Sequence, residues 1–140
     1  MRGFLLDTCV ISDATQVRPS VRVTDWLDAK SAESLFLSVI SIGEIEQGIA
    51  HLGVGARAHR LAAWLSEAIL PRFESRILSV DQAIGLRWGQ IRGAAMRAGR
   101  PLVLVDSLIA ATALEHELTI VTRNTKDFAM LDVQLINPWQ

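Results

Sequence analysis

The sequence predicts an α/β fold with a mostly parallel central sheet flanked by helices. Short apolar segments rich in strand-forming residues alternate along the chain with longer segments of helical period, and this alternation is typical of a parallel sheet covered on both faces. The 140 residues also fit one unit that buries most of its apolar surface without disulfides or a structural metal. We therefore expect a single domain spanning residues 1–140.

The first half of the chain is expected to form two strands and three helices. FLLDTCVI (4–11) is short, apolar and rich in strand formers, which predicts a central strand with Asp7 toward its exit. After a loop containing Pro19 come a short amphipathic helix around Trp26 and Leu27, a buried strand at LFLSVI (35–40), and helices at 42–52 and 56–70.

Ser41 is expected to cap the first of these two longer helices. The apolar stripe of that helix consists of Ile42, Ile45, Ile49 and Leu52. Glu44 lies on the flank of the stripe, and the residue one turn further on is Gly48, which leaves open space beside the carboxylate.

The second half continues the alternation. RILSV (76–80) is predicted to be a strand, and Asp81 is predicted to cap a long helix that Gly99 and Pro101 end. PLVLV (101–105) fits either a strand or a helix, whereas DSLIAATALEHE (106–117) is strongly helical. A fourth strand, a short helical turn and a final edge strand are expected at LTIVT (118–122), KDFAML (126–131) and VQLINPW (133–139).

Composition excludes several classes of protein. No uncharged apolar run approaches the ~20 residues that a membrane span needs, and MRGFLLD reaches an acid too soon for a signal peptide. The single cysteine, Cys9, excludes an intramolecular disulfide framework and a cysteine-based zinc knuckle. A net charge of −1 excludes a strongly basic coat for nucleic acid, so any such contact must be local. We expect a soluble cytoplasmic protein.

Acidic and amide side chains stand where the predicted apolar elements begin or end. Asp7 follows the first strand, Glu44 lies just past the second, and Asn124 and Asp127 follow the fourth, while Asp106 opens a helix. Sites in open parallel sheets form outside the carboxyl ends of the strands. These segments, distant in sequence, are therefore expected to converge on one place.

A hard divalent cation best explains such a cluster, because carboxylates that share a site repel each other unless a cation neutralises them. No set of His or Cys has the spacing of a zinc site, so oxygen ligands for Mg²⁺ or Mn²⁺ are favoured. Bound Mg²⁺ usually recruits phosphate oxygens, and phosphoryl chemistry by a metal-activated water is its natural use. Each acid taken alone is better explained as a turn cap or a solvated helix residue, and it is their joint placement that favours a metal site.

Five motifs in order along the chain, LLDTCVIS, LSVISIGEIEQGI, DSLIAATA, VTRNTKDF and INPW, resemble the PIN-domain ribonucleases of the VapC toxin class, in particular the FitB-like branch. The resemblance runs from Leu5 to Trp139. It implies a compact PIN fold, a Mg²⁺- or Mn²⁺-dependent endoribonuclease acting on RNA, a homodimer, and a cognate DNA-binding antitoxin that blocks the site. Asp7, Glu44 and Asp106 match the three acids of the family, and Thr8 matches its supporting hydroxyl.

The chain departs from the family pattern at two places. Cys9 stands where the family usually has an Asn, which removes an amide that can support Asp7. The fourth acid of the family corresponds either to Asn124, here an amide, or to Asp127. We expect Asp127 to act as an outer ligand through water and Asn124 as a positioning amide, with an acid at a helix N-terminus as the alternative for Asp127.

A second class of function stays open. The chain could keep the fold and act mainly as a catalytically weak or inactive module that regulates by binding an antitoxin, a reading to which Cys9 and Asn124 give the most support. Dimerisation is expected through apolar helix faces, because half of the residues are hydrophobic and Trp64 lies in the apolar segment AAWLSEAIL.

Overall fold

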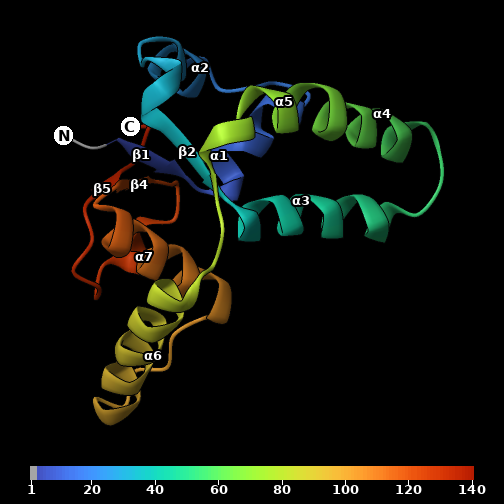
Figure 1. Cartoon of the computed structure of the whole chain (residues 1–140). Coiled ribbons are helices and arrows are strands. Elements are labelled where there is room, and N and C mark those ends of the chain that lie inside the picture. Colours follow the sequence, from blue (N-terminus) through green and yellow to red (C-terminus); the bar gives the residue numbers. More distant parts are fainter. Residues whose placement is uncertain (1–2) are drawn as a thin grey trace.

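A central sheet of five parallel strands organises the protein, whose computed structural model describes residues 3–140 (Figure 1). The strand order is β3-β2-β1-β4-β5, and each neighbouring pair is parallel. The strands are β1 (Phe4–Leu6), β2 (Leu35–Ser38), β3 (Ile77–Leu78), β4 (Thr119–Val121) and β5 (Leu135–Ile136). The predicted parallel α/β fold is thus confirmed, with the first strand at the centre of the sheet.

Helices and short helical turns connect the strands. The α-helices are α1 (Thr8–Ser12), α2 (Val21–Asp28), α3 (Val39–Leu52), α4 (Ala56–Trp64), α5 (Leu70–Arg72), α6 (Gln82–Arg97), α7 (Leu104–His116) and α8 (Thr125–Phe128). Short turns occupy η1 (Asp13–Thr15), η2 (Ala32–Ser34), η3 (Leu65–Ile69, a π-helical turn) and η4 (Glu74–Arg76). None of the helices in residues 3–140 has the length and apolar character that crossing a membrane requires.

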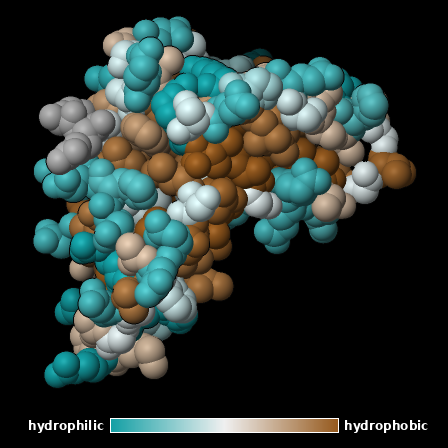
Figure 2. All heavy atoms as spheres, in the orientation of Figure 1, coloured by the Kyte–Doolittle hydropathy of each residue, from teal (hydrophilic) through white to brown (hydrophobic). Residues whose placement is uncertain are grey.

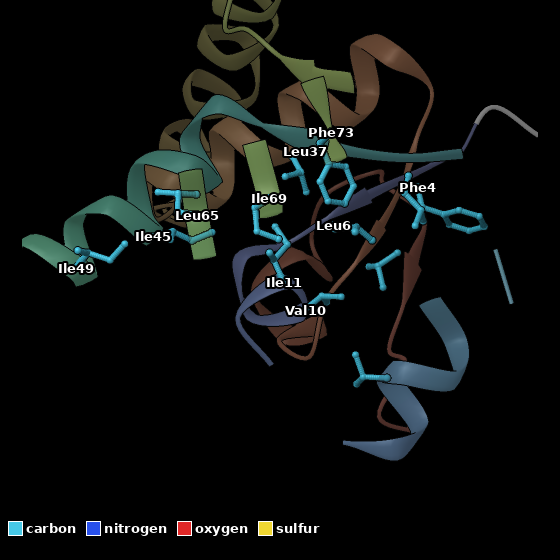
Figure 3. Packing of buried hydrophobic residues seen from close by; sticks show 13 residues of the cluster. Phe4, Leu6, Val10, Ile11, Leu37, Ile45, Ile49, Leu65, Ile69 and Phe73 are labelled. Atoms are coloured by element: carbon cyan, nitrogen blue, oxygen red, sulfur yellow. The ribbon is translucent and has the colours of Figure 1, made fainter. Parts of the chain in front are cut away.

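Two hydrophobic clusters pack on opposite faces of the sheet, as the alternation of side chains along a strand requires. Phe4 and Leu6 of β1 join one cluster and Leu5 joins the other. The first cluster, part of which is labelled in Figure 3, joins the sheet to α1, α2, α3 and the turn between α4 and α5. In the second cluster, side chains of α7 and α8 cover the other face, including the fully buried Ile109 and Phe128.

The α3–α4 pair and helix α6 extend away from the sheet (Figure 1). The antiparallel helices α3 and α4 form an arm on one side of the molecule, while α6 packs along α7 and projects from the other (Figure 1). Arg87 of α6 forms a 2.8 Å ion pair with Glu115 of α7, and the indole N–H of Trp88 donates to the Ser107 hydroxyl at 3.0 Å. Hydrophobic atoms gather on the surface between α3 and the α4–α5 segment (Figure 2).

The first two strands are shorter than the sequence predicted, because serine and aspartate caps end them. β1 stops at Leu6, and Asp7 caps α1 by accepting the Thr8 N–H at 2.9 Å. In the segment 35–40 the strand ends at Ser38, whose hydroxyl accepts the Ile40 N–H at 3.0 Å and so starts α3. The prediction that Ser41 caps this helix is wrong.

Ser41 lies in the first turn of α3, fully buried, and its hydroxyl has no hydrogen-bond partner among residues 3–140. The predicted apolar stripe of α3 is only partly buried. Ile45 and Ile49 are buried, but Leu52 at the far end of the arm is 44% exposed.

The predictions around α6 and α7 are largely confirmed. The Asp81 carboxylate accepts the Ile84 N–H at 3.0 Å, and Gly99 follows the helix with a φ of +69°, which favours glycine. Of the ambiguous segment 101–105, the first three residues have no regular structure and the rest begin α7. Asp106 is therefore in the first turn of α7 and not its first residue.

Candidate metal centre

Asp7 is the most constrained of the predicted acids. It follows the central strand, its own N–H donates to the Val121 carbonyl at 2.9 Å, and the residue is only 7% exposed. One carboxylate oxygen accepts the Thr8 N–H, and the other accepts the Thr122 hydroxyl at 2.8 Å. A buried carboxylate needs such donors, and both leave lone pairs that can face a cation.

Glu44 reaches the same region from α3. Its Oε1 accepts the Thr8 hydroxyl at 2.6 Å, across 36 positions of sequence. Thr8 therefore links the two acids, since its N–H binds Asp7 and its hydroxyl binds Glu44. The role that the family resemblance implies for Thr8, a hydroxyl that supports the metal ligands, stays a prediction.

Asp106 lies near the other acids, whose negative charges disfavour its ionised form. Burial, followed by the charges of Asp127, Asp7 and Glu44, raises the pKa of Asp106 to about 6. Charges from three other segments thus act on Asp106 at the carboxyl edge of the sheet. Burial and the neighbouring negative charges both disfavour the ionised carboxylate of Asp106, and a bound cation would offset them.

Asn124 and Asp127 border this region from the β4–α8 connection, and both are exposed. The Asn124 N–H donates to the Thr122 hydroxyl oxygen at 3.0 Å, while its side chain makes no capping bond to α8. Asp127 lies in the first turn of α8, and its charge is the largest electrostatic influence on Asp106.

These residues fit a divalent cation by charge and donor type. All the donors are carboxylate, amide or hydroxyl oxygens, which suit Mg²⁺ and Mn²⁺. In residues 3–140, however, no three side chains of His, Cys, Asp or Glu stand close enough together to hold one ion. Rotation of side chains, or the retained waters that are usual for Mg²⁺, would complete the coordination, and the assignment of Asp7, Glu44 and Asp106 as metal ligands stays a prediction.

Thr122 is the residue that sequence reasoning missed. It is fully buried at the end of β4, donates to Asp7 and accepts the Asn124 N–H. The thiol of Cys9 lies 3.9 Å from Asp7 Oδ2 and 3.8 Å from Thr122 Oγ1, and burial raises the pKa of this thiol. Cys9 stands in place of an Asn that could support Asp7. In this structure the Thr122 hydroxyl supplies that support by donating to the Asp7 carboxylate. The only signal in the sequence was a hydroxyl directly after an apolar strand.

Replacing Thr122 with valine should weaken Mn²⁺ binding about 10-fold or more, because the loss of a partner that orients a ligand typically costs 10- to 100-fold in metal affinity. Isothermal titration calorimetry with Mn²⁺ measures this. The matched control is Thr112→Val, which removes an equally buried hydroxyl that donates only to the Leu108 carbonyl of its own helix. Equal Mn²⁺ affinities in the two variants would show that the Thr122 hydroxyl does not support a metal ligand.

Comparison with known proteins gives a consistent picture. The family model described as PIN domain matches residues 4–133. The chain is 41% identical over 135 residues to toxin FitB of Neisseria gonorrhoeae, covering 96% of this chain and 97% of that protein. It is 32% identical to the VapC ribonuclease Y4jK of Sinorhizobium fredii, covering 97% of each.

Solved structures agree. The crystal structure of FitAcB from Neisseria gonorrhoeae superposes with a TM-score of 0.91 at 40% identity, covering 98% of this chain and 99% of that one. A toxin-antitoxin complex from Klebsiella pneumoniae superposes with a TM-score of 0.72 at 27% identity, covering 99% of both chains.

Proposed function

The chain belongs to the PIN-domain family, and from this premise we propose that it is a metal-dependent endoribonuclease and the toxin of a toxin–antitoxin pair. The observation that carries the proposal is that Asp106, whose pKa is raised by burial and by the charges of Asp127, Asp7 and Glu44, lies near acids from three other segments at one edge of the sheet. Relatives of nearly equal length are a toxin and a VapC ribonuclease. Cleavage of RNA phosphodiester bonds is the activity that accounts for both the cluster of acids and the relatedness to a toxin and a ribonuclease.

In this proposal Asp7, Glu44 and Asp106 hold Mg²⁺ or Mn²⁺. Two hydroxyls orient two of these acids. The Thr8 hydroxyl donates to one oxygen of Glu44, and the Thr122 hydroxyl donates to one oxygen of Asp7. Because the pKa of Asp106 is raised to about 6, a cation bound there would favour the ionised form of this carboxylate. A bound ion supplies an activated water and positive charge for the scissile phosphate.

Addition of Mg²⁺ or Mn²⁺ to the purified protein should produce cleavage of single-stranded or structured RNA that chelation with EDTA stops. Expression of the chain alone should arrest growth. Gel analysis of total RNA and of defined transcripts measures the first effect, and colony formation measures the second. Intact RNA together with unimpaired growth would rule out the ribonuclease.

The second candidate function is a partner-binding module with weak or absent catalysis. The separation of the described acidic side chains, which do not form a closed chelating set, favours it, as do Cys9 and Asn124. Differential scanning fluorimetry separates the two functions. A ribonuclease shows saturable stabilisation by Mn²⁺, whereas a module shows none.

Asp127→Asn should weaken Mn²⁺ binding and RNA cleavage less than Asp106→Asn does, with little change in melting temperature. The reason is that Asp127 is exposed and acts on Asp106 through its charge, as an outer ligand acting through water would. Asn124→Asp is the reciprocal test and should strengthen Mn²⁺ binding by adding a charge. If Asp127→Asn instead lowers the melting temperature and leaves Mn²⁺ affinity unchanged, Asp127 serves only the α8 N-terminus, a contribution of about 0.3–1 kcal/mol.

We further propose that the protein works in the cytoplasm as a homodimer and is held inactive by an antitoxin. Large apolar side chains remain exposed on α6, at the start of α7 and after α8, among them Leu86, Met96, Leu104 and Met130 at 52% or more. Such surfaces favour association. Sedimentation velocity at micromolar concentration should show a dimer, and a monomer there would contradict this part of the proposal.

A further inference from the structure

We propose that Arg18 and Arg123 bind the phosphate backbone of single-stranded RNA in a groove beside the acids, and that Trp139 positions Arg123 for this contact. The inference rests on the proposed ribonuclease function and assigns the site that guides substrate to it. The groove has a volume of about 750 Å³, and the residues that line it include Cys9, Ser12, Gln16, Arg18, Arg123 and Trp139.

The groove opens next to the candidate metal centre. Cys9 lines it, and the Cys9 sulfur is 3.9 Å from a carboxylate oxygen of Asp7. Arg123 directly follows Thr122, whose hydroxyl binds the same oxygen. A strand of RNA whose scissile phosphate lies at Asp7 therefore has this groove directly beside it.

The charges of the groove suit an anion. Arg18 and Arg123 are exposed, and neither forms an ion pair with any residue of the described range 3–140. The acid of the lining, Asp13, is buried and accepts the Ser20 N–H at 2.9 Å. RNA approaching several carboxylates on a chain of net charge −1 needs local cations, and arginine grips phosphate with two parallel hydrogen bonds.

The Trp139 ring orients the Arg123 side chain by lying against its guanidinium group. The guanidinium carbon lies 4.9 Å from the centre of the indole ring, within the range of a cation–π contact. The turn that carries the ring is itself held, because the Asn137 side chain accepts the Trp139 N–H at 2.9 Å and Pro138 is buried. The closing INPW segment thereby acquires a role in orienting the arginine.

Single-stranded RNA is the occupant that this geometry favours. The groove is open, and the hydroxyl and amide side chains of Ser12, Ser20 and Gln16 line it together with the two arginines, which suits an extended sugar–phosphate chain. Its volume is in the range of sites for small organic ligands, enough for a short stretch of nucleotides.

Binding of a short fluorescein-labelled single-stranded RNA, measured by fluorescence anisotropy in the full-length Asp106→Asn protein so that the RNA is not consumed, tests the inference. Arg123→Ala should weaken binding about tenfold, as loss of a charged hydrogen bond at an exposed site predicts. It should also reduce the slope of log Kd against log salt by about 0.7, the value for one phosphate contact to a single strand. Arg18→Ala should act in the same direction, and Arg123→Lys should retain part of the binding.

The matched control is Arg92→Ala, which removes an arginine that also lies over an indole, 5.4 Å from the Trp88 ring, but on α6 and outside the groove. It should leave RNA binding and the salt slope unchanged. Trp139→Leu should weaken binding and Trp139→Phe should preserve most of it, because phenylalanine keeps an aromatic face. In protein with Asp106 intact, Arg123→Ala should raise KM more than it lowers kcat.

The failures are distinguishable. Equal binding by the Arg123→Ala and Arg92→Ala variants, when the protein with Asp106 intact cleaves RNA, overturns the groove and leaves the ribonuclease standing. A parent protein that neither cleaves nor binds RNA overturns both. If, with Asp106 intact, Arg123→Ala abolishes the Mn²⁺-induced rise in melting temperature, Arg123 serves the metal centre and the inference is wrong.

Discussion

Asp7→Asn is expected to lower RNA cleavage about 100-fold or more. Asp7 is the buried acid at the end of the central strand, and it is the only predicted ligand with both carboxylate oxygens already oriented, by Thr8 and Thr122. Replacing a group that merely supports a metal ligand costs 10- to 100-fold, so loss of a ligand charge should cost at least the upper value. Single-turnover cleavage in saturating Mn²⁺ measures the effect.

The fold should survive this substitution. Asparagine caps a helix as well as aspartate does, so the melting temperature without metal should change little. Asp25→Asn, which neutralises an exposed acid on α2, is the matched control and should retain full cleavage. Cleavage by Asp7→Asn within a few fold of the parent protein would remove Asp7 from the catalytic centre.

Asp106→Asn should abolish stabilisation by Mn²⁺ and cleavage, yet make the metal-free protein more stable at neutral pH. Burial and the charges of three acids raise the pKa of Asp106 from 3.8 to about 6. The charged form is therefore unfavourable in the folded state at pH 7, and a neutral amide removes that cost. Thermal unfolding in EDTA and in Mn²⁺ gives both results from one protein preparation.

The pH dependence has a definite sign. Between pH 3.8 and about 6 the folded protein holds more protons on Asp106 than the unfolded chain does, so this group makes the metal-free protein less stable as the pH rises through that window. Asp106→Asn should remove this contribution, and Mn²⁺ should oppose it by favouring the ionised carboxylate. Identical pH profiles for the parent and the variant in EDTA would show that the pKa of Asp106 is not raised in the folded protein.

Local signals accounted for most of the secondary structure. The apolar FLL segment, the cap at Asp81 and the stop at Gly99 depend on residues near each other in sequence, and each is confirmed by the structure. Where two nearby serines could each cap the same helix, the sequence-based prediction selected the wrong one. Ser38 and Ser41 are both serines that precede helical residues, and only the pairing of β2 with its neighbours decides that the strand ends at Ser38.

By itself, the sequence determined the parallel α/β fold and the acids at the carboxyl ends of its strands, because periodicity and residue type are local properties. Only the tertiary structure decided which groups support those acids. The Thr122 hydroxyl reaches Asp7 across 115 positions, and Thr8 reaches Glu44 across 36. Such contacts exist because β4 and β2 both pair with β1, and a strand order that joins distant segments leaves no periodic trace in the chain.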